Sequence, residues 1–370
     1  MNSIIYLGMD VHQNSYSLCA YNGFTGEILG ETRCSSDIKF VLKFIENLKK
    51  KYGEDIQIKA GYEAGCLGYV PYKQLTNHGI DCDILAPTTM YRSSKNKLNK
   101  NDKLDARNIA TNLANGTYKS VYVPSEDDLA VKEYIRMLDD AKIARKKVKQ
   151  QINAFTLRYD LHYQGKSKWT MAHIKWLRDL ELSPLLKETL NERLALYDSL
   201  CDKIERFSER LKELSHNESY EKPVSQLRCL KGIDTTSAMT LHVEISDFLR
   251  FSTAKKFSSY VGLTPGEDSS GDKTQYLSIT KQGNATVRNT LVECAQALVK
   301  GKIGVKSKAV KQRQKGQEAA AIEYADKAVE RLQRKYHKMV KRGVNHNKAI
   351  TAVARELACF VWGMETGKIY

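Results

Sequence analysis

The sequence lacks the cysteine and histidine patterns of zinc-binding and disulfide-rich proteins. Its 370 residues include eight cysteines with no C-x-x-C pair and eight histidines with no H-E-x-x-H motif. The phosphate-loop signature G-x-x-x-x-G-K-[ST] is also missing. Zinc chemistry and phosphate-loop ATP hydrolysis are therefore unsupported, and we expect the cysteines to be reduced core residues.

Long apolar runs are absent as well. No stretch approaches the roughly 20 apolar residues that a membrane-spanning helix needs. The N-terminal segment MNSIIYLGMDVHQ interrupts its apolar run with Asp10 and His12, unlike a secretory signal peptide. We therefore expect a cytoplasmic protein with no membrane association.

Basic charge is what the sequence has in excess. It contains 59 Lys and Arg residues against 43 Asp and Glu residues, which gives a formal net charge of +16 at pH 7. Such a balance suits a polyanionic partner, and nucleic acid is favoured over an anionic membrane surface. At 370 residues the chain is long enough for two or three domains, each with its own core.

The first part of the chain alternates strand and helix patterns. Three strands in quick succession are predicted at IIYLGMD, SYSLCAYN and EILGETRC, followed by an amphipathic helix through FVLKFIENLKK. The pattern then predicts a strand at IQIKAGYE, a helix at LGYVPYKQLTNHG, a strand at IDCDILAP and a helix at DKLDARNIATNLANG. This order is typical of a ribonuclease-H-like α/β domain, which we assign to residues 1–124.

The rest of the chain is predicted to be mostly helical. Residues 125–222 are helical and highly charged, and LNERLALYDSLCDKIERFSERLKEL has the apolar spacing of a coiled-coil seam. The partner of that seam is either a helix of the same chain or the same helix of another subunit. HNESYEKP, residues 216–223, is interpreted as a linker into a C-terminal domain, residues 223–370, whose basic tail favours contact with a nucleic-acid backbone.

Four carboxylates mark the N-terminal domain. Asp10 and Glu63 end predicted strands, and Asp102 and Asp105 stand three apart at the front of a predicted helix. One interpretation makes Asp102 the helix cap and places Asp105 in a first turn that favours negative charge. The other makes all four the ligands of Mg²⁺, because ribonuclease-H-like sheets bring such positions to one edge and two-metal phosphoryl transfer needs such a cluster. The convergence favours the metal site.

Two segments of the C-terminal domain also resemble functional motifs. LRCLKGIDTTSAMTLHVEI resembles a helix-hairpin-helix, although Asp234 stands where a second glycine is usual, so a purely structural turn is an equal alternative. Ser269 and Ser270 lie between Gly266 and Gly271, a composition that by itself predicts a flexible surface loop. Because no histidine is nearby to act as a base, a hydrolase triad is not indicated.

Together these residues resemble the transposases, or serine-using recombinases, of the IS110/IS1111 insertion-sequence group. GMDVHQ, GYEAG and KNDKLDAR resemble the group's Asp-Glu-Asp-Asp domain, which is related to the RuvC Holliday-junction resolvases. GKSKWTMAHIKWLRDL and the coiled-coil segment resemble its helical insert. LKGID, YVGLTP, SSG and ITKQGN resemble its C-terminal transposase domain. The resemblance covers nearly the whole chain.

The resemblance implies a composite active site. Asp10, Glu63, Asp102 and Asp105 would bind Mg²⁺, and Ser270, the serine directly before glycine, would form a covalent phosphoserine link to DNA. It also implies donor and target DNA as partners, chosen by a guide RNA that the element encodes, and a nucleoid-associated protein. The expected assembly is a tetramer, a dimer of dimers, in which the acidic domain of one subunit meets the serine domain of another.

Three alternatives remain open from the sequence. The first is a RuvC-like nuclease or resolvase in which Ser270 is structural, and the second is a non-catalytic nucleic-acid-binding protein whose acids are helix caps. An actin-like sugar or acetate kinase shares the opening strands but would need Gly-rich phosphate loops that this sequence does not have.

Overall fold

The computed structural model describes residues 4–91, 101–270 and 273–369, without the side chains of residues 269, 270, 273 and 274. The chain divides into two compact units, an N-terminal unit of residues 1–123 and a C-terminal unit of residues 124–370. The further division of the second unit at residue 222 stays a prediction.

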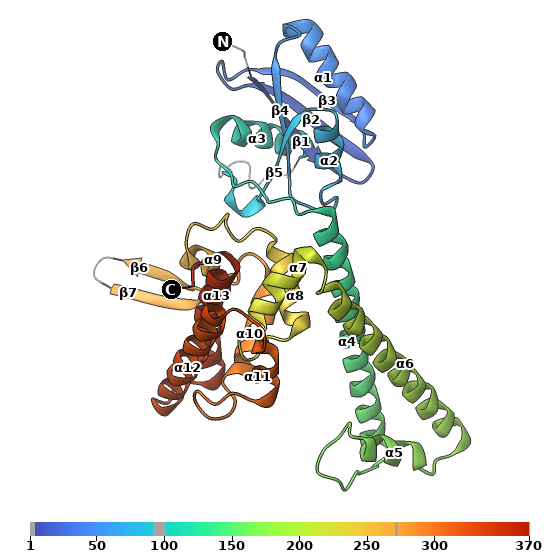
Figure 1. The fold of residues 1–370 in the computed structure, drawn as a ribbon. Coiled ribbons are helices and arrows are strands. Elements are labelled where there is room, and N and C mark those ends of the chain that lie inside the picture. Colours follow the sequence, from blue (N-terminus) through green and yellow to red (C-terminus); the bar gives the residue numbers. More distant parts are fainter. Residues whose placement is uncertain (1–3, 92–100, 271–272, 370) are drawn as a thin grey trace. The chain divides into compact units, whose positions relative to one another are not determined.

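A five-stranded mixed sheet forms the centre of the N-terminal unit (Figure 1). The strand order is β3-β2-β1-β4-β5, with β1, β2 and β3 antiparallel and with β4 parallel to both β1 and β5. This arrangement confirms the mixed α/β class. The elements are β1 (Ile4–Val11), β2 (Ser15–Asn22), β3 (Ile28–Ser35), α1 (Ile38–Tyr52), β4 (Gln57–Glu63), α2 (Val70–Asn77), β5 (Asp81–Leu85), the 3-10 helix η1 (Pro87–Thr89) and α3 (Asp102–Asn115).

Alternation along the central strands gives the sheet two different faces. Leu7 and Met9 of β1 and Tyr62 of β4 are fully buried in one core with Val41 of α1. Because successive side chains of a strand point to opposite faces, the residues between them face the other side. There α3 covers the sheet, and its Ala106 packs in a small separate cluster.

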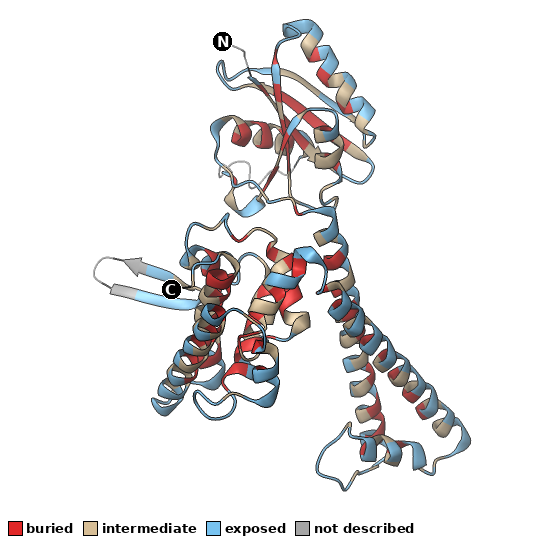
Figure 2. Ribbon diagram, in the orientation of Figure 1, coloured by how far each residue is buried: buried red, intermediate tan, exposed pale blue. Residues whose placement is uncertain are grey.

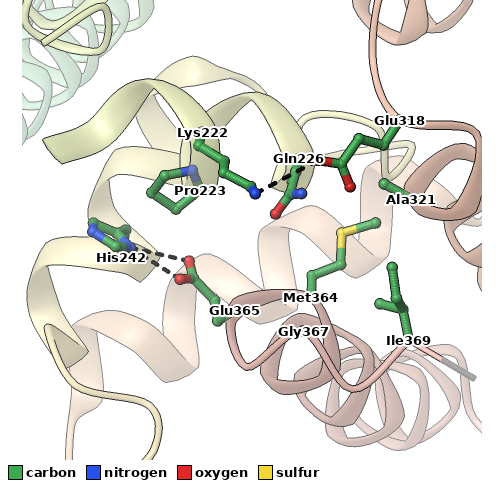
Figure 3. A pocket seen from close by; sticks show the side chains of 10 residues that line it. All are labelled: Lys222, Pro223, Gln226, His242, Glu318, Ala321, Met364, Glu365, Gly367 and Ile369. Carbon is green, nitrogen blue, oxygen red and sulfur yellow. Dashed lines mark hydrogen bonds and ion pairs between the residues drawn. The ribbon is translucent and has the colours of Figure 1, made fainter. Parts of the chain in front are cut away.

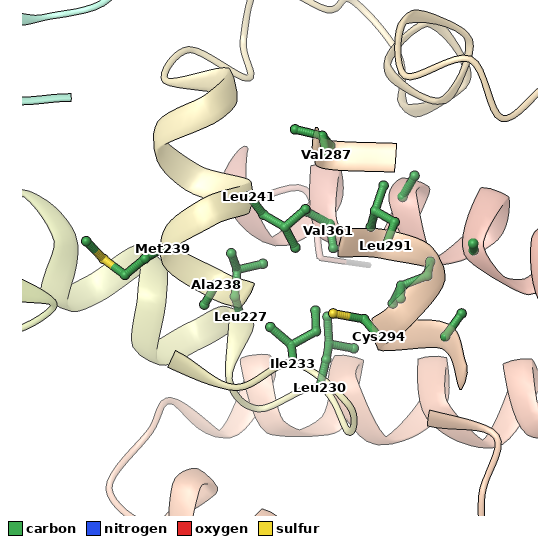
Figure 4. Close-up of a cluster of buried hydrophobic side chains, with 14 of the residues drawn as sticks. Leu227, Leu230, Ile233, Ala238, Met239, Leu241, Val287, Leu291, Cys294 and Val361 are labelled. Atoms are coloured by element: carbon green, nitrogen blue, oxygen red, sulfur yellow. The ribbon is translucent and has the colours of Figure 1, made fainter. Parts of the chain in front are cut away.

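The C-terminal unit is helical apart from one β-hairpin (Figures 1 and 2). In Figure 4, Leu230, Ile233 and Cys294 meet in its main core, where helices of the second half of the chain converge. Its elements are α4 (Glu126–Arg158), α5 (Met171–Asp179), α6 (Pro184–Leu214), α7 (Glu218–Leu227), α8 (Thr235–Ile245), α9 (Ala254–Tyr260), β6 (Pro265–Ser270), β7 (Lys273–Ile279), α10 (Ala285–Leu298), α11 (Lys308–Gln314), α12 (Ala319–Lys341) and α13 (His346–Glu365).

The predicted coiled-coil seam lies on α6 and packs against α4 of the same chain. Leu190 and Leu194 of α6 are buried in one cluster with Ile152 and Phe155 of α4. The apolar stripe of α6 therefore has an intrachain partner, a question that the spacing alone left open. Placing Glu at Leu194 would disrupt this helical hairpin rather than report on subunit assembly.

Truncating the seam should destabilise the helical hairpin. Leu194 is 3% exposed, so Leu194→Ala should lower the free energy of unfolding by about 2–5 kcal/mol through lost burial and a cavity. Leu196 lies on the same helix but is 51% exposed, and Leu196→Ala should change that energy by about 0.5 kcal/mol or less. Urea titration of the two variants makes the comparison, and equal losses would contradict the packing described here.

The predicted linker is wrong. Residues 218–227 form α7, with Pro223 inside the helix. The reason is tertiary: Tyr220 is only 3% exposed, and its hydroxyl donates a hydrogen bond to Asp128 of α4 at 2.9 Å. Burial of one aromatic ring in the main core outweighs the polar composition of this segment.

The predicted Ser/Gly-rich loop is also wrong, because Ser269 and Ser270 end strand β6 of an antiparallel hairpin. Ser270 is in backbone register with Lys273 of β7. The signal that the composition obscured is the strand-forming segment KTQYLSI, residues 273–279, which follows the serines after two residues.

Candidate active site

The ends of two adjacent parallel strands place Asp10 and Glu63 side by side. Strands β1 and β4 are parallel, and Met9 is in register with Tyr62. Asp10 and Glu63 are the next residue on each strand, so both face away from the α1 core and towards the α3 side. The two carboxylates thus occupy the carboxyl end of the sheet on one face.

Glycine in β1 allows α3 to cross this face at backbone contact distance. A Cβ atom built on Gly8 would lie 2.2 Å from the carbonyl oxygen of Ala106 and 2.4 Å from the amide nitrogen of Ala110. No side chain fits there, and only glycine permits the approach. Since Asp10 follows Gly8 by two residues, the first turn of α3 comes to the carboxyl end of β1.

That first turn carries Asp102 and Asp105, but neither is the helix cap. Asn101 is the N-cap residue, and its side-chain oxygen accepts a hydrogen bond from the amide of Lys103 at 2.9 Å. The interpretation of Asp102 as the cap is therefore wrong. Both aspartates remain in the first turn, where the helix dipole favours negative charge.

Asp10 and Asp102 converge, with His12 between them. The His12 Nε2 atom lies 3.2 Å from Asp10 Oδ2 and 3.8 Å from Asp102 Oδ1. Among the described residues, Asp10, His12 and Asp102 offer ligand atoms that all lie within 4.8 Å of one another. Two carboxylates and an imidazole are a donor set compatible with a divalent cation.

Electrostatics at Asp10 agree with a site for a cation. Burial raises the pKa of Asp10, His12 lowers it, and the nearby charges of Asp105 and Asp102 raise it further, with a net upward shift. Accumulated carboxylates of this kind are costly unless a cation compensates them. Asp105 therefore acts on Asp10 electrostatically, although it is not one of the three grouped ligands.

His12 is the residue that sequence reasoning missed. Its position two residues after Asp10 was the available signal, but a single exposed histidine carries little weight without a neighbouring partner. In the structure its ring is hydrogen-bonded to Asp10, and it is either a further metal ligand or a positive counter-charge to the two aspartates.

A partly buried ion pair fixes α3 over the sheet. Arg107 of α3 donates two hydrogen bonds to Glu31 of β3, the second at 2.8 Å, and Lys103 lies 3.0 Å from the same carboxylate. These contacts lower the pKa of Glu31 to about 2. Arg33 of β3 also lies 3.6 Å from Asp102. The edge strand β3 thus positions α3, the helix that carries Asp102 and Asp105.

The predicted nucleophile lies in the C-terminal unit. The backbone places Ser270 at the end of β6, next to the hairpin turn, while its side chain lies outside the described residues. Arg288, which follows the hairpin, donates hydrogen bonds to the carbonyl oxygens of Val261 and Gln282, both at 3.0 Å. The hydrogen bonds of Arg288 thus stabilise the loop that follows the hairpin.

The helix-hairpin-helix-like segment forms a packed turn between α7 and α8. Gly232 has φ of 93°, and a Cβ atom there would lie 2.4 Å from the carbonyl oxygen of Cys294 in α10. Asp234 caps α8 by accepting a hydrogen bond from the amide of Ser237 at 2.8 Å. This carboxylate occupies the helix N-terminus that a phosphate would need, so the geometry favours the structural turn.

Within the described ranges, no helix combines the length and the apolar character needed to cross a bilayer.

Known transposases match both units of the chain. The DEDD transposase model of the IS110 group matches residues 7–159, and the model of the IS116/IS110/IS902 transposase family matches residues 224–309. A Sinorhizobium fredii protein designated a transposase, y4qE, is 31% identical over 97% of this chain and 88% of its own length. The transposase for insertion sequence element IS1533 of Leptospira borgpetersenii is 32% identical over 67% of this chain and 71% of its own length.

A more distant relative extends the match across the group. The transposase for insertion sequence element IS1111A of Coxiella burnetii is 23% identical over 88% of both chains. Family models on both units, near-complete coverage by a relative above 30% identity, and the acidic site at the carboxyl end of the sheet all agree. The chain belongs to the IS110 family of insertion-sequence transposases and is a DNA transposase.

Proposed function

We propose that this transposase cuts and rejoins DNA with Ser270 as its nucleophile and with Asp10, Glu63, Asp102 and Asp105 as ligands of Mg²⁺. The observation that carries the proposal is the convergence of Asp10 and Asp102 from β1 and α3. Glu63 ends the adjacent strand, and Asp105 is on the same first turn as Asp102. The test is the set of replacements argued in the Discussion.

When bound, Mg²⁺ would neutralise phosphate charge and lower the pKa of an attacking hydroxyl. The residues of the chain supply the rest. Asp10 is held by a central strand and Asp102 by a helix fixed through the Arg107–Glu31 pair, so the carboxylates are preorganised. His12, next to Asp10, can hold a proton or offer a nitrogen ligand.

The covalent step exchanges one phosphate ester bond for another and so conserves the bond energy. The Oγ atom of Ser270 forms a bond to phosphorus, the bond from phosphorus to one deoxyribose oxygen breaks, and that oxygen takes up a proton while the serine hydroxyl loses one. In the reverse step a hydroxyl of the other DNA strand attacks the phosphoserine and frees the serine. No water enters, so no phosphodiester energy is lost.

Water is the nucleophile in the second candidate function. The same acidic cluster would serve a RuvC-like nuclease, in which Ser270 has no covalent role. The match of the second family model to residues 224–309, which include Ser270, favours recombination over simple hydrolysis.

Target choice by an element-encoded guide RNA is the next part of the proposal, together with assembly into tetramers. The similarity to the IS110 group supports both parts. The net charge of +16 supports the binding of nucleic acid. Both nucleic acids are polyanions that such a protein attracts.

RNA should be required for sequence-specific DNA binding by the purified protein. Without RNA, we expect only non-specific binding, which should weaken by about 10³-fold or more between 50 and 200 mM salt if roughly six phosphates are contacted. Electrophoretic mobility shifts with matched and scrambled target duplexes, with and without RNA, measure this. Selection of the matched duplex by RNA-free protein would reject the guide.

A further inference from the structure

One groove in the C-terminal unit combines apolar, aromatic and basic side chains. It encloses about 530 Å³ between the β6–β7 hairpin and α13. Its lining includes Pro265, Tyr276 and Leu277 from the hairpin and Lys348, Thr351 and Arg355 from α13. Apolar and aromatic groups from one element thus face basic groups from the other.

The two basic residues of the groove are available to a ligand. Lys348 and Arg355 lie seven residues apart on α13 and therefore on one helix face. Glu356, the acid next to Arg355, pairs with Arg331 and Lys335 of α12. Within the described part of the chain, no ion pair joins Lys348 or Arg355 to a carboxylate.

A second pocket of similar size shows the contrast (Figure 3). It encloses about 490 Å³, and its charged groups are already paired, His242 with Glu365 at 3.0 Å and Lys222 with Glu318 at 3.5 Å. Burial lowers the pKa of His242, but the hydrogen bond and charge of Glu365 raise it more. A pocket with neutralised charges has little attraction for a polyanion.

The lining of the groove fits a nucleotide. Tyr276 is 69% exposed and Leu277 is 50% exposed, so both side chains are accessible to a ligand. Aromatic side chains beside basic ones are the common means of binding single-stranded nucleic acid, since bases stack on rings and phosphates pair with cations.

The groove is close to the predicted nucleophile along the hairpin. Tyr276 is in register with Glu267, three residues before Ser270 on β6. Three strand residues span about 10 Å. Stacked nucleotides advance about 3.4 Å per step. A base in the groove would therefore be within about three nucleotides of a phosphate at Ser270.

We propose that this groove binds an unstacked base of the DNA strand that lies along the β6–β7 hairpin, with Tyr276 against the base and Lys348 and Arg355 on the flanking phosphates. The inference rests on the proposed function in taking that strand to be the DNA substrate. It adds a subsite that would hold the cleaved strand in place between cutting and rejoining.

Photocrosslinking tests the groove without requiring catalysis. The full-length protein with Ser270→Ala is irradiated with oligothymidylate that contains one 5-iododeoxyuridine, and the crosslinked peptides are mapped. We expect crosslinks on the segments that contain Tyr276 or residues 347–355. Tyr276→Ala should lose them and lower affinity about fivefold or more, whereas Tyr276→Phe, which keeps the ring, should retain both.

Matched controls separate stacking from charge. Lys348→Ala should weaken oligothymidylate binding more than Lys338→Ala, an exposed lysine on α12 outside the groove. An abasic oligomer of the same length should bind the wild-type protein less tightly than oligothymidylate, and Tyr276→Ala should remove that difference.

Four results would overturn the inference, and the first three come from nucleic-acid binding. These are crosslinks confined to other segments, equal affinity for the abasic oligomer and oligothymidylate in the wild-type protein, and tighter binding of oligouridylate, which would assign the groove to RNA. A lower mass of Tyr276→Ala in light scattering with unchanged DNA affinity would assign it to a second copy of the chain. Crosslinks in the groove without any covalent adduct in the active protein would support the groove and reject the serine nucleophile.

Discussion

Replacing Asp10 by Asn should reduce DNA cleavage about a hundredfold or more while leaving the protein folded. The substitution keeps the size of the side chain but removes one ligand charge from the site at the end of β1. Losing a single group that stabilises a phosphoryl-transfer transition state commonly costs that much. Glu63→Gln, Asp102→Asn and Asp105→Asn should have effects of the same order. Cleavage of a labelled duplex in the presence of Mg²⁺ measures the rate.

Asp37→Asn is the matched control for these replacements. Asp37 caps α1 in the same unit by accepting a hydrogen bond from the amide of Lys39 at 3.0 Å. Asparagine caps helices as well as aspartate does, so cleavage should be unchanged. Full activity in Asp105→Asn would instead assign Asp105 to stabilising the helix N-terminus and remove it from the metal site. Full activity in Asp10→Asn would reject the site altogether.

His12, which the sequence analysis did not single out, has two possible roles at the site. If its imidazole is a metal ligand, it binds the ion together with Asp10 and Asp102, the set that the structure brings together. If it is only a counter-charge, the four carboxylates suffice. The proposal for the acidic quartet stands in either case.

The N-terminal unit could be predicted largely because its signals are local and agree with one another. The structure has the strands β1, β2 and β4 and the amphipathic helix α1 where the apolar periodicity of the sequence predicts them. The carboxylates could be placed because strand ends and a helix start are visible in the sequence. The contact of α3 with Gly8 was not visible, since it depends on which helix crosses which strand.

The C-terminal unit was predicted less well because tertiary contacts decide it. The segment at 216–223 reads as polar, yet burial of Tyr220 against Asp128 makes it helical. The seam on α6 could have paired within or between chains, and only the fold shows α4 opposite it. In the serine segment, the Gly- and Ser-rich composition predicted a loop, yet β6 pairs with β7 in an antiparallel hairpin.

Replacing Ser270 by Ala should abolish recombination and lower strand cleavage by about 10³-fold or more, the scale of losing a covalent nucleophile. Under the recombinase proposal, interrupted reactions of the wild-type protein should also trap it covalently on DNA. The control is one residue away on the same strand: Ser269→Ala should be far milder, because only Ser270 directly precedes glycine, the position proposed for the nucleophile. Equal loss in both variants would indicate damage to the hairpin instead.

Peptide mapping of protein trapped on DNA tests the central claim most directly. The wild-type protein is denatured during the reaction, digested with protease and nuclease, and the peptide that carries a nucleotide phosphate is identified by mass spectrometry. The proposal predicts one modified residue, Ser270, and no modified peptide from Asp10→Asn or Ser270→Ala. A phosphate on Ser269, or an enzyme that recombines DNA with no covalent adduct at any serine, would contradict it.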